Sequence, residues 1–78
     1  MEERYIFING QIYRYLERVG KGPKLLFLHG LSDSSDQILP ISKLLPLDWH
    51  LLALDQRGHG GSYKPNYKYT PKDYAKDI

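Results

Sequence analysis

The 78-residue sequence has no cysteine and almost no net charge, because its 11 basic and 9 acidic side chains leave a formal charge of only +2. Without cysteine there is no disulfide framework and no thiolate metal site. A charge this small, with the two signs interspersed, argues against nucleic-acid binding and against attraction to an anionic membrane. We therefore expect a soluble protein of a reducing compartment, located in the cytoplasm.

Long apolar runs are also missing. Runs such as residues 51–54 are far shorter than the roughly 20 residues that span a membrane, and the acidic start of the chain is unlike a signal peptide. The three histidines, His29, His50 and His59, are spaced too unevenly to suggest a metal site. We expect no metal, no cofactor and no membrane partner.

The N-terminal quarter predicts a β-hairpin. Residues 5–8 are β-branched or aromatic, Asn9-Gly10 offers the two positive-φ residues of a type I′ turn, and residues 11–19 alternate in polarity. Neither face of this hairpin is purely apolar. We therefore expect the hairpin at the edge of a sheet and partly exposed to water.

Two later segments predict buried strands with a helix between them. Residues 24–29 contain a continuous apolar run, typical of a strand covered on both faces in a parallel sheet, and residues 49–54 form the second strand. Apolar residues recur at helical spacing between the strands (Ile38, Ile41, Leu44 and Leu45). Since Pro40 fits only in a first turn, the helix should begin near Asp36 or Gln37 and end before Pro46.

A second helix is predicted near the C-terminal end, with Thr70 as N-cap, Pro71 at the first helical position and Asp73 as the acid at N3. The order of elements is hairpin, strand, helix, strand, loop and helix start, which contains one parallel βαβ unit. Two buried strands need more neighbours and covering helices than this chain supplies. We therefore expect an incomplete α/β sheet.

The carboxyl ends of the two buried strands carry the candidate chemistry, because open α/β sheets bind ligands there. His29-Gly30 ends the first strand in a sharp turn that leaves the backbone N–H of Leu31 free to face a crevice. Such an amide suits the oxyanion of an acyl-transfer intermediate. On these residues alone, a turn that merely ends the strand is the simpler interpretation.

The second strand runs into a glycine-rich loop, residues 55–62, whose sequence predicts an unusual backbone. Arg57 could lock the loop through an ion pair, since it lies between Asp55 and His59. A phosphate cradle lacks its motifs here. His59 is open to two interpretations, a catalytic base or a histidine with structural hydrogen bonds, and the second is favoured.

Tyrosines and lysines alternate beyond this loop (Tyr63, Lys64, Tyr67, Lys68, Tyr69, Lys72 and Tyr74). Such interleaving can bind single-stranded nucleic acid by stacking and charge. The prolines Pro65 and Pro71 break the spacing, however, and acidic residues share the last helix. Packing of the tyrosines against the sheet is the favoured interpretation, and we expect no nucleic-acid partner.

Taken together, "LLFLHGLSDSS", "WHLLALDQRGHGGSYKP" and "YTPKDYAKDI" resemble the N-terminal part of the α/β-hydrolase fold superfamily, which includes esterases and lipases. The resemblance implies an antiparallel hairpin, then a strand, helix, strand and helix start, with residues 1–78 as one fragment of a single domain. It implies that Leu31 N–H is an oxyanion-hole donor and that His29 and Gly30 shape its turn. The remaining implied positions form a structural loop near the mouth of the site (Asp55, Arg57, Gly58, His59, Gly60 and Ser62).

The resemblance also implies what is missing. In this family the nucleophile sits in a G-x-S-x-G elbow, followed by the acid and the histidine, and no such elbow occurs here. Ser32 and Leu31 stand where epoxide hydrolases usually have proline and dehalogenases commonly have asparagine. The resemblance thus favours a serine hydrolase of small ester-like substrates.

We therefore expect the 78-residue chain alone to be inactive and, with an uncovered apolar edge strand, to self-associate or stay partly unfolded. Two alternatives stay open. One is a non-catalytic binding or interaction protein of the same fold. The other is a truncated product without function.

Overall fold

The structure is a computed structural model that describes residues 1–30, 33–65 and 69–78. Its elements are, in chain order, β1 (Glu2–Ile8), β2 (Gln11–Arg18), β3 (Lys24–Leu28), the 3-10 turn η1 (Ser35–Gln37), α1 (Ile38–Ser42), β4 (His50–Leu54) and α2 (Pro71–Asp77). This is the order that the sequence predicts, with strand ends shifted by one residue at β3 and β4.

The hairpin of β1 and β2 turns through Asn9 and Gly10, whose φ angles of 51° and 79° are both positive. The predicted type I′ turn needs this pair of signs, and its twist matches the right-handed twist of the strands. The two strands pair antiparallel from Glu2 opposite Glu17 to Ile8 opposite Gln11. As predicted, the hairpin lies at one edge of the sheet.

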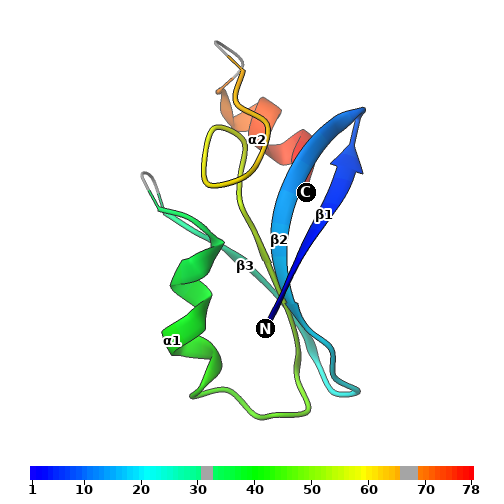
Figure 1. Cartoon of the computed structure of the whole chain (residues 1–78), viewed down its shortest axis with the longest axis vertical. Coiled ribbons are helices and arrows are strands. Elements are labelled where there is room, and N and C mark those ends of the chain that lie inside the picture. The colour runs from blue at the N-terminus through cyan, green and yellow to red at the C-terminus, as the bar shows by residue number, and fades with distance from the viewer. Residues whose placement is uncertain (31–32, 66–68) are drawn as a thin grey trace.

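Four strands form one mixed sheet in the order β1-β2-β4-β3 (Figure 1). β4 runs antiparallel to β2 and parallel to β3, with Leu28 opposite Leu54. The sequence predicts this parallel pair. Because β3 and β4 are parallel neighbours, the residues that follow them meet at one edge of the sheet.

The predicted single helix before β4 is shorter than expected and begins as a 3-10 turn. Ser34 caps η1 by accepting a hydrogen bond from Asp36 N–H. α1 then starts at Ile38, which keeps Pro40 within the first turn, where a missing N–H costs nothing. The helix ends at Ser42, whose carbonyl accepts a hydrogen bond from Arg18 of β2.

This early end leaves most of the predicted apolar stripe exposed. Ile38 is fully buried, whereas Ile41 and Leu44 keep 41% and 86% of their surface exposed. The core beneath the helix is small, with Ile38 packed against Leu16 and Ala53 and with Phe27 alongside. The apolar residues begin at Ile38 as the helical spacing predicts, but of these residues only Ile38 is fully buried against the sheet.

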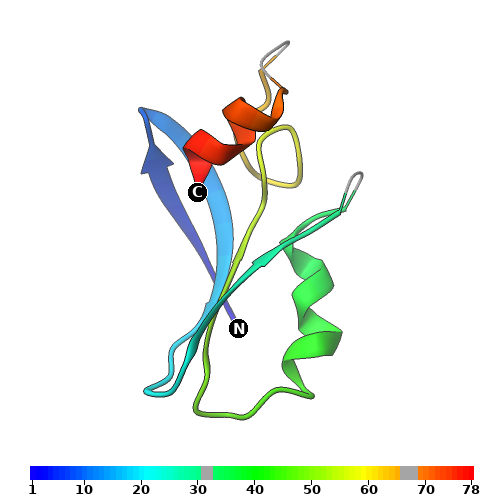
Figure 2. The same ribbon diagram turned by 180° about the vertical axis from the view of Figure 1, so that it is seen from behind.

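α2 begins where the sequence predicts. Thr70 accepts a hydrogen bond from Asp73 N–H, the Asp73 carboxylate accepts from Thr70 N–H, and Pro71 occupies the first turn. This capping box satisfies backbone donors that have no partner within the helix. The helix lies across one end of the sheet, beside the loop that follows β4 (Figures 1 and 2).

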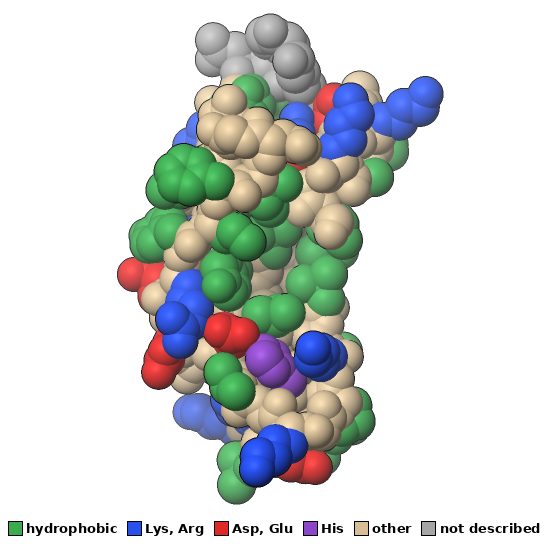
Figure 3. Space-filling model, turned by 90° about the vertical axis from the view of Figure 1, so that its right-hand side faces the viewer, with side chains coloured by type: hydrophobic (Ala, Val, Ile, Leu, Met, Phe, Trp, Pro, Cys, Tyr) green, Lys and Arg blue, Asp and Glu red, His purple; other side chains and the backbone are tan. Residues whose placement is uncertain are grey.

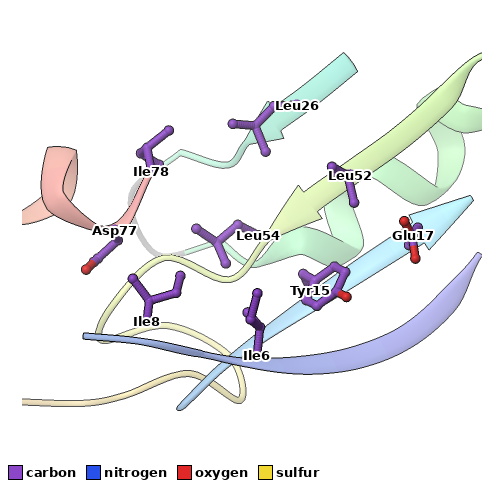
Figure 4. Close-up of a pocket in the computed structure, with 9 residues that line it drawn as sticks. All are labelled: Ile6, Ile8, Tyr15, Glu17, Leu26, Leu52, Leu54, Asp77 and Ile78. Atoms are coloured by element: carbon purple, nitrogen blue, oxygen red, sulfur yellow. The ribbon is translucent and has the colours of Figure 1, made fainter. Parts of the chain in front are cut away.

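The two helices cover opposite faces of the sheet. α1 covers the face of Leu16 and Ala53, and α2 reaches the other face, where Asp77 and Ile78 border a hollow of about 320 Å³ (Figure 4). The rest of this hollow is lined by side chains of all four strands: Ile6, Ile8, Tyr15, Glu17, Leu26, Leu52 and Leu54. Figure 3 shows hydrophobic side chains gathered along this face.

The prediction that β3 is covered on both faces is therefore wrong for this chain. Leu26 and Leu28 remain 46% and 43% exposed, and burial along β3 alternates from residue to residue. The physical reason is that β3 is at the edge of the sheet and α2 lies at one end of this face.

Candidate functional site

The candidate residues of the sequence meet at the carboxyl edge of the parallel pair. His29 follows β3 and Asp55 follows β4, and the last paired residues of the two strands are Leu28 and Leu54. The His29–Gly30 corner and the loop of residues 55–62 therefore start side by side. Leu31, the predicted oxyanion donor, lies outside the described residues.

His29 is buried at 5% exposure and both of its ring nitrogens are engaged. Nε2 lies 3.0 Å from Gln56 N, and Nδ1 lies 2.7 Å from Gly30 O. Because Nε2 accepts the amide proton of Gln56, the neutral ring carries its proton on Nδ1 and donates it to Gly30 O. His29 thus shapes the corner and has no free nitrogen with which to act as a base.

Gln56 is a residue of the site that the sequence did not single out. Its backbone N–H donates to the His29 ring, and its side-chain Nε2 donates to His29 O at 2.8 Å. One residue therefore holds both the side chain and the backbone of His29. The available signal was a polar residue two positions after the end of a buried strand.

Asp55 is fully buried and acts as the hub of the loop. It accepts hydrogen bonds from Ser35 N at 2.7 Å, Gly61 N at 2.9 Å and Arg14 Nη1 at 3.1 Å. Burial alone would raise the pKa of Asp55, but the hydrogen bonds from Ser35, Gly61 and Arg14 outweigh it and lower the pKa. Asp55 is therefore a structural anion at neutral pH.

Gly60 explains the glycine-rich character of this loop. Its φ is +52°, and a Cβ built on it would lie 2.1 Å from the Asp55 carboxylate. Only glycine has room for this approach and tolerates this backbone conformation. Gly58 is similarly restricted, since a Cβ there would lie 2.5 Å from the Tyr69 ring.

The predicted ion pair of Arg57 exists, but its partner is not in the loop. Arg57 Nε and Nη2 donate to the two carboxylate oxygens of Asp77, each at 2.8 Å. Tyr13 in β2 donates its hydroxyl to the same carboxylate at 2.8 Å. Burial, together with the hydrogen bond to Asp77, raises the pKa of Tyr13 to about 12. Arg57 thus ties the loop to α2 because Asp55 is already occupied by Arg14 and Ser35.

Ser62 and His59 have structural contacts. Ser62 is buried and accepts a hydrogen bond from Arg14 N at 2.8 Å. His59 Nδ1 lies 2.9 Å from Arg57 O, and the His59 ring lies 4.7 Å from the His29 ring, centre to centre. Among the residues that the structure describes, no serine hydroxyl is hydrogen-bonded to a histidine ring.

An open cavity of about 500 Å³ lies beside the corner. It is lined by His29, Gly30, Gln56, Gly58, His59, Tyr69 and Tyr74. The tyrosines pack near this cavity, with the Tyr69 and Tyr74 rings 6.2 Å apart. Tyr67 and Lys68 of the tyrosine–lysine series lie outside the described residues.

Among the residues that the structure describes, no group of three or more His, Asp or Glu side chains is placed to hold a metal ion. Within the same residues, neither helix has the length and apolar character needed to cross a membrane.

A sequence model of the alpha/beta hydrolase fold matches residues 23–78, which is more than half of the chain. The fold is that of the α/β hydrolases, and the chain belongs to the α/β-hydrolase fold family. Its four strands and two helices correspond to the N-terminal part of that fold.

The relatives cover several reactions. The chain is 41% identical over 69 residues to a 2-(acetamidomethylene)succinate hydrolase from Mesorhizobium japonicum, and the match covers 88% of this chain and 25% of that protein. A solved E-2-(acetamidomethylene)succinate hydrolase matches with a TM-score of 0.85 at 37% identity, over 97% of this chain and 28% of the other. Human monoacylglycerol lipase ABHD6 is 40% identical over 50 residues, covering 64% of this chain and 15% of the lipase.

A haloalkane dehalogenase from Bradyrhizobium elkanii also matches, with a TM-score of 0.85 at 32% identity, over 97% of this chain and 25% of that protein. The chain thus spans about a quarter or less of the length of these relatives.

Proposed function

We propose that residues 1–78 are the N-terminal part of a single α/β-hydrolase domain that hydrolyses an ester or a related acyl bond of a small molecule. The observation that carries the proposal is the His29–Gly30 corner, which borders an open cavity at the carboxyl edge of the sheet. The role proposed for Leu31 is to donate its backbone N–H to the oxyanion that forms when the carbonyl is attacked.

The chemistry of the described residues supports a separation of roles, in which residues 1–78 bind the oxyanion and other residues supply the nucleophile, acid and base. His29 has both nitrogens engaged, and the described serines have no histidine partner, so these residues offer no activated nucleophile. We propose that the nucleophile, acid and base lie outside residues 1–78. The 78-residue chain by itself is then inactive, while it supplies the turn that binds developing negative charge.

Two observations favour acyl-bond hydrolysis within this family. Leu31 and Ser32 differ from the residues expected at these positions in dehalogenases and epoxide hydrolases. Two of the relatives are, by name, hydrolases of an acetamido compound and of monoacylglycerols. Both named substrates contain an acyl group, an amide in the first and an ester in the second.

A fluorophosphonate probe tests this proposal, because it forms a covalent bond with activated serines. The complete gene product should hydrolyse a p-nitrophenyl ester and take up one probe molecule at a serine outside residues 1–78. The 78-residue chain should do neither. Labelling of Ser62, or turnover by the 78-residue chain, would overturn the proposed separation of roles.

A non-catalytic binding protein of the same fold is the second candidate, and the same measurement separates the two. Such a protein would keep the cavity and the corner but would neither take up the probe nor turn over an ester. Detectable binding of an ester without its hydrolysis would favour this candidate.

We also propose that the 78-residue chain self-associates when it is expressed alone. The exposed leucines of β3 and the apolar hollow support this proposal, because an apolar strand at a sheet edge is a template for pairing with another chain.

A further inference from the structure

Gln56 is bound to His29 at two separate points. The Gln56 backbone N–H donates to His29 Nε2 at 3.0 Å, and the Gln56 side-chain amide donates to His29 O at 2.8 Å. Both hydrogen bonds join the segments that follow β3 and β4. The strand ladder itself stops one residue earlier, at the Leu28 and Leu54 pair. Gln56 therefore extends the connection between the strands to the corner.

The bond to His29 O has a specific geometric consequence. The peptide between His29 and Gly30 is planar, so fixing its carbonyl oxygen also fixes the direction of its N–H. The ring of His29 is locked as well, since Gln56 N–H holds Nε2 and Gly30 O holds Nδ1. The orientation of the His29–Gly30 peptide and that of the His29 ring are therefore both fixed.

Asp55, the residue before Gln56, holds Ser35 at the start of η1. Asp55 accepts a hydrogen bond from Ser35 N at 2.7 Å, and the Asp55 carboxylate is in turn held by Gly61 and Arg14. Two consecutive residues after β4, Asp55 and Gln56, therefore hold Ser35 at the start of η1 and His29 at the end of β3.

From this arrangement we propose that Gln56 is a positioning residue for the hydrolytic reaction: it holds the His29–Gly30 corner in the orientation that stabilises the transition state. The inference rests on the proposed function. Gln56 acts through His29, whereas Asp55 also supports the fold through several partners. Gln56 is consequently the residue whose removal should affect rate more than stability.

The test uses the complete protein with Gln56 replaced by Met, which keeps the length of the side chain and removes the donor to His29 O. We expect kcat to fall about ten- to a hundred-fold, the size of effect expected from a small misplacement of catalytic groups. KM should stay unchanged. The inhibition constant of a trifluoromethyl ketone, which mimics the tetrahedral intermediate, should rise by the same factor as kcat falls.

Gln11→Met is the matched control, because Gln11 is exposed at the start of β2 and is not among the residues that line the cavity beside the corner. It should leave kcat and the inhibition constant unchanged. A purely structural role for Gln56 would instead lower the melting temperature and the fraction of titratable active sites, with kcat per active site unaltered. That result would overturn the inference.

Gln56→Glu provides a second measurement if Gln56→Met does not fold. A protonated carboxyl can donate to His29 O and an ionised one cannot, so the activity relative to wild type should rise as the pH falls toward about 4, where glutamate takes up a proton. A flat ratio would overturn the inference. Absence of probe labelling and turnover in the wild-type protein would instead refute the proposed function, so the two failures are distinct.

Discussion

Arg57 and Asp77 form a two-point ion pair in which both N–H···O distances are 2.8 Å, although twenty residues separate them in the chain. Their side chains are 8% and 3% exposed, and Tyr13 donates to the same carboxylate. The pair joins the glycine-rich loop to α2, and the tyrosine joins both to β2. One carboxylate therefore holds three segments around the end of the sheet.

Asp77→Asn should destabilise the protein strongly, because it removes the negative charge that the buried guanidinium of Arg57 binds at two points, and the Asp73 carboxylate lies farther away, at 4.0 Å. Removing one partner of a buried pair costs about 3–5 kcal/mol. Urea unfolding of the variant and the wild type measures this difference in the free energy of unfolding.

Asp36→Asn is the matched control for that measurement. Asp36 also pairs with an arginine, at 3.1 Å from Arg14 Nη2, but its side chain is 57% exposed. An exposed pair contributes about 1 kcal/mol or less. If the two substitutions had equal effects, burial would not be what makes the Asp77 pair important.

Asp55 predicts a specific pH dependence of stability. Its pKa in the folded protein is lowered from the ordinary value of 3.8, despite burial, by the hydrogen bonds from Ser35, Gly61 and Arg14. The folded state therefore binds the ionised form better than the unfolded state does. This contribution is fully present above pH 3.8 and is lost as the pH falls through the folded-state pKa.

Asp55→Asn should accordingly reduce stability at neutral pH by about 3 kcal/mol or more, the cost of breaking a buried charge network. The difference in unfolding free energy from wild type should shrink below pH 3.8. Chemical unfolding at a series of pH values measures it. Asp48→Asn, at an exposed aspartate, controls for the change in net charge. A difference in unfolding free energy that stays constant down to low pH would contradict the conclusion that Asp55 is an anion with a lowered pKa.

The outline of the fold could be predicted from local patterns in the sequence. Asn9-Gly10 specified the turn, Thr70, Pro71 and Asp73 specified the start of α2, and the apolar run of β3 indicated a strand beside a parallel neighbour. Each of these signals depends on residues a few positions apart. Backbone geometry and capping act over the same distance, so such signals are reliable.

The contacts of the site could not be predicted in the same way. Arg57 pairs with Asp77 instead of Asp55, and Gln56 holds His29 across 27 positions of sequence. Which residues pair in this way depends on how the loops are arranged in three dimensions. The apolar run of β3 predicts that Leu26 and Leu28 are buried, because such a run is typical of a strand covered on both faces in a complete sheet. The elements described here cover only part of the sheet, so both leucines stay exposed.

The exposed apolar surface of β3 should cause the 78-residue chain to associate when it is expressed alone. The occupant expected on β3 and the adjoining face is a second copy of the chain, because β3 is at the edge of the described sheet and presents unpaired backbone groups beside exposed leucines.

Leu26→Lys should weaken association, since a lysine at an edge strand must be desolvated when another strand pairs with it. Leu44→Lys introduces the same charge at a side chain that is 86% exposed and lies away from the sheet. Sedimentation velocity over a range of concentrations should show a concentration-dependent increase in sedimentation coefficient for wild type and Leu44→Lys, and a smaller one for Leu26→Lys. A monomeric wild type at all concentrations would refute self-association, and equal behaviour of the two variants would show that β3 is not the contact.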